Sequence, residues 1–142
     1  MTDPSSPVKN ALEEGTALTL DFTKLIQIGM ADQQVVPVVL VDHESDEVLF
    51  VGYANQLALS ATLERQQAVL WSTSRNELWH KGATSGDTLS LVEVRVNCEQ
   101  NSLMYRVRVD GSGSCHTSNA DGASRDGCYY RALDDTTTLR FV

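Results

Sequence analysis

The sequence predicts a small α+β domain that is mostly β, of mixed topology, with about six strands and one long helix. Its length of 142 residues fits one domain. Short apolar or alternating segments bounded by polar residues recur along the chain, as β-strands do, and one segment has helical periodicity. No internal repeat, low-complexity tract or linker divides the sequence. These patterns do not predict the order of the strands.

The first two strands are predicted to form a hairpin. Residues Val35–Val41 (VVPVVLV) are mostly β-branched, and Val48–Tyr53 (VLFVGY) form a second apolar run. The polar residues Asp42–Asp46 between them are expected to form the turn. Pro37 lacks an N–H group for a β ladder, so we expect an edge position or an irregularity at that residue.

A helix and a strand are predicted to follow the hairpin. Asn55 is a good N-cap, and the apolar residues after it recur at helical spacing, which predicts a helix from Asn55 to about Gln66. Residues Ala68–Ser72 (AVLWS) are expected to form a strand. The next segment, Thr73–Asp87, is polar and contains glycine and an aromatic residue, so we expect a long functional loop without a regular element.

Two alternating segments, Leu89–Val96 and Leu103–Val109, predict a second hairpin around a turn at residues 97–102. In the first strand we expect the face of Ser90 and of the valines at 92, 94 and 96 to be the apolar one. In the second strand, the leucine, tyrosine and valines at alternate positions should share one face.

The two ends of the chain lie outside this pattern. Residues 1–18 have the composition of a loose accessory segment, so the main domain is expected to occupy residues 19–142. Residues 110–127 are rich in Gly, Ser, Asn and Asp and are predicted to be a loop. Cys128-Tyr129-Tyr130 then begins a short final strand.

The balance of charge excludes some classes of partner. The chain carries 11 Lys and Arg residues against 19 Asp and Glu residues, which gives a net charge of −8. Binding to nucleic acid or to an anionic membrane needs a cationic surface, so we expect neither partner. The chain has no apolar stretch of the roughly 18–20 residues that span a membrane. Residues Met1–Asn10 lack the apolar region of a secretory signal, and the expected location is therefore the cytoplasm.

Three cysteines, Cys98, Cys115 and Cys128, are the first candidates for chemistry. They cannot all pair within one chain, and a reducing cytosol disfavours disulfides. Three thiolates are enough for a catalytic zinc ion, which commonly takes three protein ligands and keeps a position for water. No CxxC pair is present, however, and cysteine is often a small buried apolar residue. Spacing alone supports the zinc site and the buried thiols equally.

Two further segments are rich in groups that take part in reactions. In Cys115-His116-Thr117 the imidazole could act as a base beside a thiolate, or it could be an exposed loop histidine. The segment Trp79–Gly86 combines an aromatic ring, an imidazole, a lysine, two hydroxyls and two glycines. Glycine lets the backbone approach a ligand, and Thr, Ser and Lys are common phosphate donors. The alternative is a surface turn with Trp79 folded back onto the core.

Longer motifs resemble those of one family. Residues Ser72–Gly82 (STSRNELWHKG), with Thr84-Ser85-Gly86, resemble the signature of the phosphoribosyl-AMP cyclohydrolases of histidine biosynthesis. The family's remaining motifs are similar, in the same order, to the Cys98 turn, Cys115-His116-Thr117 and Cys128-Tyr129-Tyr130-Arg131. The resemblance spans about Val35–Arg131, most of the chain, and its S-R-x-x-L-W-H-K-G-x-T-S-G string is highly specific.

The resemblance implies an intertwined homodimer that opens the adenine ring of N1-(5-phosphoribosyl)-AMP, a small-molecule nucleotide, by hydrolysis between N1 and C6. One zinc ion per subunit would be held by Cys98, Cys115 and Cys128, contributed from both subunits, and zinc-bound hydroxide would attack the ring. The resemblance also implies that His116 is the catalytic base. Such a base is the more needed because three thiolates make zinc a weaker Lewis acid than three histidines do. The expected substrate-binding residues are Ser74, Arg75, Trp79, His80, Lys81, Thr84, Ser85 and Gly86.

The chain departs from the family's pattern at two places. The family's first zinc cysteine lies in an Asp-Cys-Asp-x-Asp turn whose aspartates bind the magnesium that the family also needs. Here that turn has Asn97, Glu99 and Asn101 at the magnesium positions, so we expect weakened magnesium binding. The stretch between Cys115 and Cys128 is several residues longer than in typical members, roughly by Ser118–Asp126. This extra material is flexible in composition and is expected to alter the pocket or its lid.

Two alternative functions stay open on the sequence. The missing aspartates and the longer loop favour a paralogue that acts on another purine nucleotide. A zinc-bound dimer that has lost activity and serves as a regulatory or binding subunit is the second alternative. The presence of His116 and of the Trp-His-Lys-Gly segment weighs against it, because a structural zinc site needs neither.

Overall fold

The structure is a computed structural model, and it describes residues 7–142. The elements in chain order are α1 (Pro7–Glu14), α2 (Lys24–Met30), β1 (Val36–Asp42), β2 (Val48–Ala54), α3 (Gln56–Arg65), β3 (Val69–Ser72), β4 (Glu77–His80), β5 (Leu89–Val96), β6 (Leu103–Val109), β7 (Arg131–Leu133) and β8 (Leu139–Phe141). The fold is therefore mixed and mostly β, as predicted. None of the helices in residues 7–142 has the length and apolar content that crossing a membrane requires.

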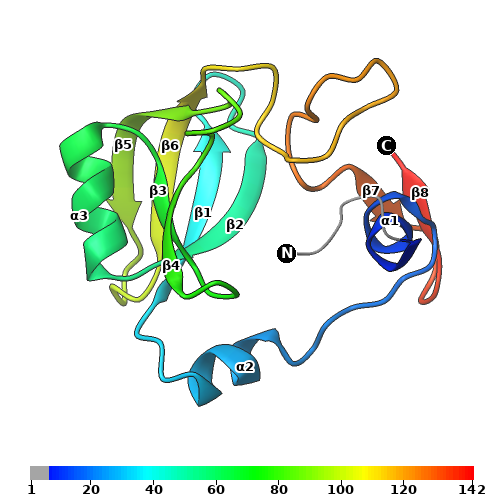
Figure 1. Ribbon diagram of the computed structural model, residues 1–142, viewed down its shortest axis with the longest axis horizontal. Coiled ribbons are helices and arrows are strands. Elements are labelled where there is room, and N and C mark those ends of the chain that lie inside the picture. Colours follow the sequence, from blue (N-terminus) through cyan, green and yellow to red (C-terminus); the bar gives the residue numbers. More distant parts are fainter. Residues whose placement is uncertain (1–6) are drawn as a thin grey trace.

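A four-stranded sheet in the order β2-β1-β6-β5 forms the body of the molecule (Figure 1). β1 pairs antiparallel with β2 and parallel with β6, and β5 pairs antiparallel with β6. The two predicted hairpins are thus confirmed, and the parallel β1–β6 pairing joins them into one sheet. The β3–β4 hairpin contacts β2, and α3 contacts β3. Buried residues from the sheet, α3 and β3 form the core, among them Val38, Leu40, Leu70 and Tyr105.

Helix α3 confirms the prediction for residues 55–66. The Asn55 side chain accepts a hydrogen bond from the Ala58 N–H at 2.9 Å, and Gln66 ends the helix in a left-handed conformation. The buried Thr62 hydroxyl lies 2.8 Å from the Val69 carbonyl, which ties α3 to β3. The prediction of one long helix is not confirmed, because α3 has ten residues and the described chain contains α1 and α2 as well.

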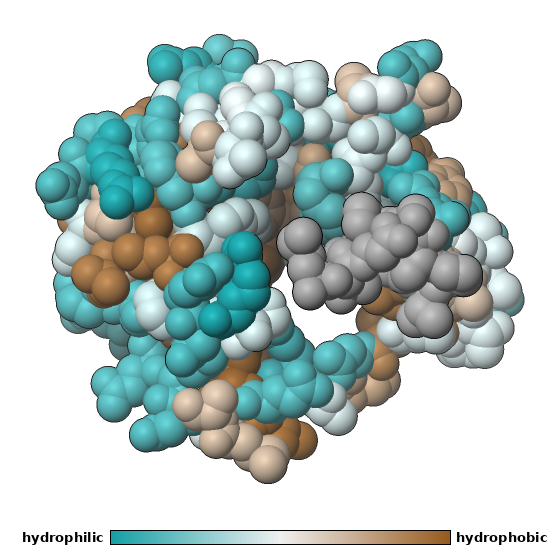
Figure 2. Space-filling model, in the orientation of Figure 1, coloured by the Kyte–Doolittle hydropathy of each residue, from teal (hydrophilic) through white to brown (hydrophobic). Residues whose placement is uncertain are grey.

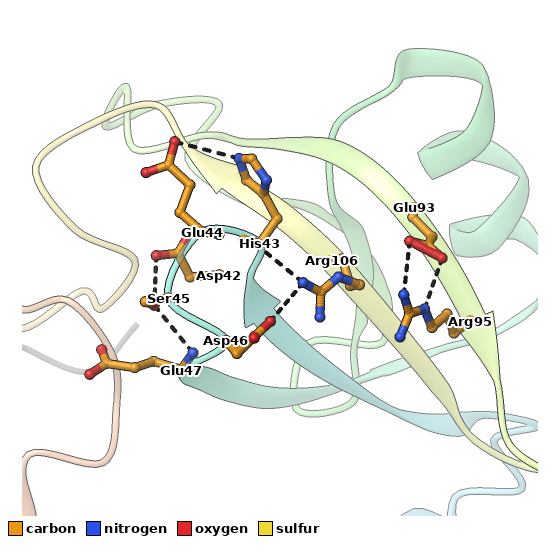
Figure 3. A network of polar contacts seen from close by, with 9 residues as sticks. All are labelled: Asp42, His43, Glu44, Ser45, Asp46, Glu47, Glu93, Arg95 and Arg106. Carbon is orange, nitrogen blue, oxygen red and sulfur yellow. Dashed lines mark hydrogen bonds and ion pairs between the residues drawn. The ribbon is translucent and has the colours of Figure 1, made fainter.

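The edge position expected for Pro37 is wrong, because β1 lies inside the sheet. The parallel pairing of β1 with β6 begins only at Val38, so no β6 residue is paired with the proline. The register irregularity of the β1–β2 pair lies between Leu40 and Val41. The turn after β1 is held from β6, where the Arg106 guanidinium donates to the Asp46 carboxylate at 2.7 Å (Figure 3).

The predicted apolar face of β5 is wrong for Val92 and Val96 and right for Val94. Leu89 is fully buried, whereas Val92 and Val96 are about half exposed. A register shift between Leu91 and Glu93 interrupts the alternation, and after it Val94 packs against the core. A β-bulge adds one residue to a strand and so reverses which face the following side chains occupy. β6 has no such shift, and its tyrosine and valines share the core face as predicted.

Two short strands in the second half of the chain, β4 and β8, were missed. β4 lies inside the segment expected to be a loop and pairs with β3. Residues 128–130 are not a strand, since β7 begins at Arg131 and pairs with β8.

Helix α1 lies beside the β7–β8 hairpin, and the chain then runs to α2, which lies below the sheet in this view (Figure 1). The Tyr130 hydroxyl donates to the Glu13 carbonyl at 2.6 Å, and the Arg125 guanidinium pairs with Glu14 at 2.8 Å. Residues 1–6 of the expected accessory segment lie outside the described residues, and its boundary at residue 18 stays a prediction.

The segment around α2 exposes large apolar side chains, which Figure 2 shows as hydrophobic surface in the region of α2. Only Ile28 of α2 is buried. Phe22 is 86% exposed and Met30 is 82% exposed. Burying one such side chain is worth about 1.5–3 kcal/mol, so this surface leaves considerable stabilisation unused in a single chain.

Candidate active site

One cleft of about 360 Å³ brings together the segments that sequence analysis selected separately. One wall is the β3–β4 hairpin with the residues that follow it, from Arg75 to Asp87. The opposite wall is the loop between β6 and β7, which contributes Cys115, His116 and Cys128. The Trp-His-Lys-Gly segment and two of the three cysteines therefore face one shared space.

The two cysteines of the loop lie next to each other, with Cys115 Sγ 3.8 Å from Cys128 Sγ. Cys115 is buried, and its N–H donates to the Arg125 carbonyl at 3.0 Å. The Cys128 N–H donates to the carbonyl of Leu49 on β2 at 2.7 Å, which fixes the end of the loop to the sheet. The hydrogen bond from the Cys128 thiol lowers the pKa of Cys115 to about 5, and the same contact raises the pKa of Cys128.

A buried lysine lies close to this thiol pair. Lys81 is 6% exposed, and its ammonium donates to the Asp87 carbonyl at 3.2 Å. Burial lowers the pKa of Lys81, while the negative charges of Asp87 and of the two cysteines act in the opposite direction. A cation at this depth favours anionic sulfur in the loop and an anionic group of a ligand in the cleft.

His116 lines the same cleft and is exposed. Its Nε2 lies 3.0 Å from Oε1 of Glu13 on α1. When Nε2 carries the proton and donates to this carboxylate, Nδ1 is left with a lone pair that can accept a proton. The pairing therefore orients the ring and selects a tautomer suited to a base.

Six of the eight expected substrate-binding residues line the cleft, namely Arg75, Trp79, His80, Lys81, Thr84 and Ser85. Ser74 and Gly86 do not line it, although Gly86 adopts a positive φ of 86° in the turn beside it. The Trp79 ring packs against Phe50 at a centroid distance of 6.0 Å, so it also belongs to the core. His80 Nε2 lies 2.7 Å from the Gln67 side chain, and burial lowers the pKa of its imidazole.

The third cysteine is not part of this cleft. Cys98 is exposed in the β5–β6 turn, whereas the loop with the other two cysteines follows the opposite end of β6. At about 3.3 Å per residue, the seven residues of β6 separate the two places by roughly 20 Å. Accordingly, residues 7–142 of one chain contain no cluster of three His, Cys, Asp or Glu side chains that could hold a metal ion.

The turn around Cys98 is closed by amide hydrogen bonds. Oδ1 of Asn97 accepts the N–H groups of Asn101 and Ser102, each at 2.9 Å. The Asn97 amide donates to Asn101 Oδ1 at 2.7 Å, and the Asn101 amide donates to Glu99 at 3.3 Å. The side chains at the three expected magnesium positions thus bond to one another and to the backbone.

Sequence reasoning missed several residues that line the cleft, including Phe50, Asp87, Ser114 and Ser124. It also missed Glu13, which does not line the cleft but pairs with His116. Glu13 is 103 positions from His116, and no local pattern joins two residues so far apart. Asp87 was detectable, because it is the charged residue that directly follows the Thr-Ser-Gly string.

Comparisons with known proteins agree with these motifs. A family model described as "Phosphoribosyl-AMP cyclohydrolase" matches residues 50–130. A phosphoribosyl-AMP cyclohydrolase from Haloarcula marismortui is 38% identical over 112 residues, which cover 79% of this chain and 88% of the relative. One from Brucella anthropi is 39% identical over 132 residues, or 92% and 84% of the two chains. One from Haloquadratum walsbyi is 40% identical over 117 residues, or 82% and 83%.

Proposed function

The chain belongs to the phosphoribosyl-AMP cyclohydrolase family, and we propose that it is the hydrolase of histidine biosynthesis that opens the adenine ring of N1-(5-phosphoribosyl)-AMP between N1 and C6. The observation that carries this proposal is the shared cleft. It holds a thiol pair, an imidazole paired with a carboxylate, and a buried lysine within one space. Ring opening by water needs an activated water, a base and a polar site for the nucleotide, and these residues match that list.

The thiol pair fits a zinc ion. Two thiols at 3.8 Å, one of which ionises readily, are donors that zinc prefers. We propose that Cys115 and Cys128 of one chain and Cys98 of a second copy hold one zinc ion per subunit. The separation of Cys98 from the other two within a chain supports ligands from two chains. A bound zinc ion supplies Lewis acidity, which lowers the pKa of water towards neutrality.

The proposed role of His116 is to take the proton of the attacking water on Nδ1 while Glu13 holds Nε2. The water oxygen bonds to C6, the π pair of the exocyclic C6–N bond moves to that nitrogen, and this nitrogen takes the remaining proton of the water. The C6–N1 bond then breaks as the C6 carbonyl forms, and its electron pair stays on N1. The same imidazole then returns the proton to N1. The products are a carboxamide at C6 and an amidine nitrogen at N1, so atoms and charge balance.

The phosphates of the substrate are assigned to the wall formed by the β3–β4 hairpin and the residues after it. Arg75 and Lys81 supply positive charge at two places along this wall, and Thr84 and Ser85 supply hydroxyl donors. The chain is acidic overall, so these cations form the local basic pocket that an anionic substrate needs.

The proposed working form is a homodimer. The exposed apolar residues around α2 support it, because a surface of this kind is usually covered in an assembly. A second copy would also bring Cys98 to the thiol pair. A homodimer would thus cover the exposed apolar surface and supply the third zinc ligand.

The turn around Cys98 does not fit the family's magnesium ion, and no step of the proposed reaction uses one. One carboxylate, Glu99, faces two neutral amides whose oxygens already accept hydrogen bonds. Magnesium prefers carboxylate oxygens and is reluctant to lose its waters. We therefore propose that this chain needs zinc but does not depend on this magnesium site.

The proposal is tested by an assay of the purified protein that follows product absorbance. We expect turnover with zinc, loss of turnover after chelation, recovery on adding zinc, and little effect of added magnesium. Absence of turnover under every metal condition would contradict the proposed activity.

A second candidate substrate has a specific observation in its favour. The longer loop reaches the cleft, because Ser124 within the extra residues lines it. A paralogue that acts on another purine nucleotide would use such a change in the wall of its pocket. A panel of purine nucleotides separates the two cases, and turnover of another member faster than N1-(5-phosphoribosyl)-AMP would favour the paralogue.

A further inference from the structure

We propose that Asp87 is a positioning residue that holds the cysteine-bearing loop against the opposite wall of the cleft. Its carboxylate accepts the Ser112 N–H on Oδ1 at 3.2 Å and the Ser124 hydroxyl on Oδ2 at 2.8 Å. These two serines lie on opposite sides of Cys115 along the chain. We call the set of Asp87, Ser112 and Ser124 the Asp87 bridge.

The bridge joins two arms of the loop, one before Cys115 with Ser112 and one after it with Ser124. These two arms also contact each other. The Ser124 N–H donates to the Ser112 hydroxyl at 3.3 Å. The arms continue in contact toward Cys115, whose N–H donates to the Arg125 carbonyl. A Cβ atom at Gly113 would lie 2.4 Å from the Ser124 carbonyl oxygen, so the arms meet backbone to backbone. Holding both arms at Ser112 and Ser124 therefore fixes the position of Cys115.

The other side of the bridge is fixed to the wall that carries Lys81. The backbone carbonyl of Asp87 accepts from the Lys81 ammonium, and its N–H donates to the Ser85 hydroxyl at 3.3 Å. A Cβ atom at Gly111 would lie 2.1 Å from Asp87 Oδ1, and one at Gly82 would lie 2.1 Å from the Asp87 carbonyl carbon. The chain thus has glycine at both places where its backbone passes close to this residue.

The bridge changes the expectation for the longer loop. Its composition predicted flexibility, but Ser124, which lies in the extra residues, is bonded to the wall of the cleft. Within residues 7–142, the hydrogen bonds of Asp87 go to serines and to Lys81, and none of them goes to a thiol. Asp87 acts on the thiols by positioning the loop that carries Cys115. Its loss should therefore lower kcat more than it raises KM.

Hydrogen exchange of the purified full-length protein measures this effect without substrate. We expect Asp87→Ala to speed amide exchange of peptides within residues 110–127 by at least about tenfold. Asp87→Asn should stay within about threefold of wild type, because Oδ1 still accepts from Ser112 and the Ser124 hydroxyl can accept from the new amide. Asp121→Asn, an equal change of charge at an exposed position in the same loop, is the matched control and should leave exchange unchanged.

Kinetics and a double variant complete the test. The kinetic measurement rests on the proposed function. In it, Asp87→Ala should lower kcat at least about tenfold and leave KM within about threefold of wild type. Ser124→Ala should have a smaller effect that disappears in the Asp87→Ala background, since both remove the same contact.

Folded Asp87→Ala with unchanged loop exchange would overturn the inference, and so would additive effects of the two variants. If Asp87→Ala does not fold, unchanged loop exchange in Ser124→Ala would overturn it. A wild-type protein without turnover would contradict the proposed function alone, because the exchange result would still test the bridge.

Discussion

Cys115 and Cys128 show what the residue type predicts and what only the structure adds. A thiol is a possible zinc ligand, but its distance from other thiols depends on the fold. Sequence spacing left a zinc site and buried thiols equally supported, because no CxxC pair joins the three cysteines. The fold places two of the sulfurs 3.8 Å apart through a loop of 13 positions. That closeness depends on hydrogen bonds of the loop with itself and with β2, which no local pattern encodes.

Each cysteine is expected to contribute to the zinc site. Cys98→Ser, Cys115→Ser and Cys128→Ser should each reduce zinc per chain by most of its wild-type value, because a thiolate ligand is lost. Metal analysis of the purified variants measures this directly. Asp121→Asn serves as the control and should keep full zinc content. Wild-type zinc content in any cysteine variant would contradict its assignment as a ligand.

His116 is expected to act in proton transfer without holding the fold together. His116→Ala should lower kcat by about 10²–10⁴-fold, the usual contribution of a general base, while zinc content and the unfolding midpoint change little. His43→Ala removes an imidazole that lies in the β1–β2 turn, outside the cleft, and should leave kcat unchanged. An unchanged rate in His116→Ala would remove this residue from the mechanism.

At the scale of elements, the predictions succeeded where periodicity is uninterrupted. α3, β1, β2 and β6 lie close to their predicted ranges, because capping and alternation are local properties. β5 failed on its buried face, since a bulge reverses the alternation and nothing in the local composition marks it. β4 was missed because its four residues are polar at both ends and are stabilised by pairing with β3.

The turn between β5 and β6 is expected to be stable without a divalent cation. In wild type, neither magnesium nor its removal should shift the urea midpoint, because amide hydrogen bonds already close the turn. Asn97→Ala should lower the free energy of unfolding by about 1 kcal/mol, since two backbone N–H groups lose their acceptor. A rise of the wild-type midpoint with millimolar magnesium would contradict this account.

The contact of α1 with the loop is expected to weaken in acid. The hydrogen bond from Arg125 holds the pKa of the Glu14 carboxyl below its usual value of 4.5. A lowered pKa adds stability above the pKa of the unfolded chain, and this is lost as pH falls through the folded pKa. Glu14→Gln should therefore destabilise the protein more at pH 7 than in acid, near pH 3. Urea unfolding at both pH values checks this, and equal losses would contradict it.

At the scale of the whole molecule, the mixed and mostly β character of the fold was predictable, but the assembly of the candidate site was not. The cleft arises because the β6–β7 loop returns to β2 and faces the β3–β4 hairpin, and such long-range contacts leave no periodic pattern. The site also has only two of its three proposed zinc ligands in one chain. The central claim is therefore about two chains acting together.

Mixing two inactive variants tests that claim most directly. The Cys98→Ser protein and the Cys115→Ser protein, each by itself, are expected to lack an intact site. In a mixed dimer, the Cys98→Ser chain supplies Cys115 and Cys128, and the Cys115→Ser chain supplies Cys98. One of the two sites then has all three cysteines. Random exchange of equal amounts makes about half of the dimers mixed, and each mixed dimer has one intact site of two. About a quarter of wild-type activity and zinc content should therefore return. Absence of any recovery, in mixtures shown to contain mixed dimers, would contradict a zinc site shared between two copies of the chain.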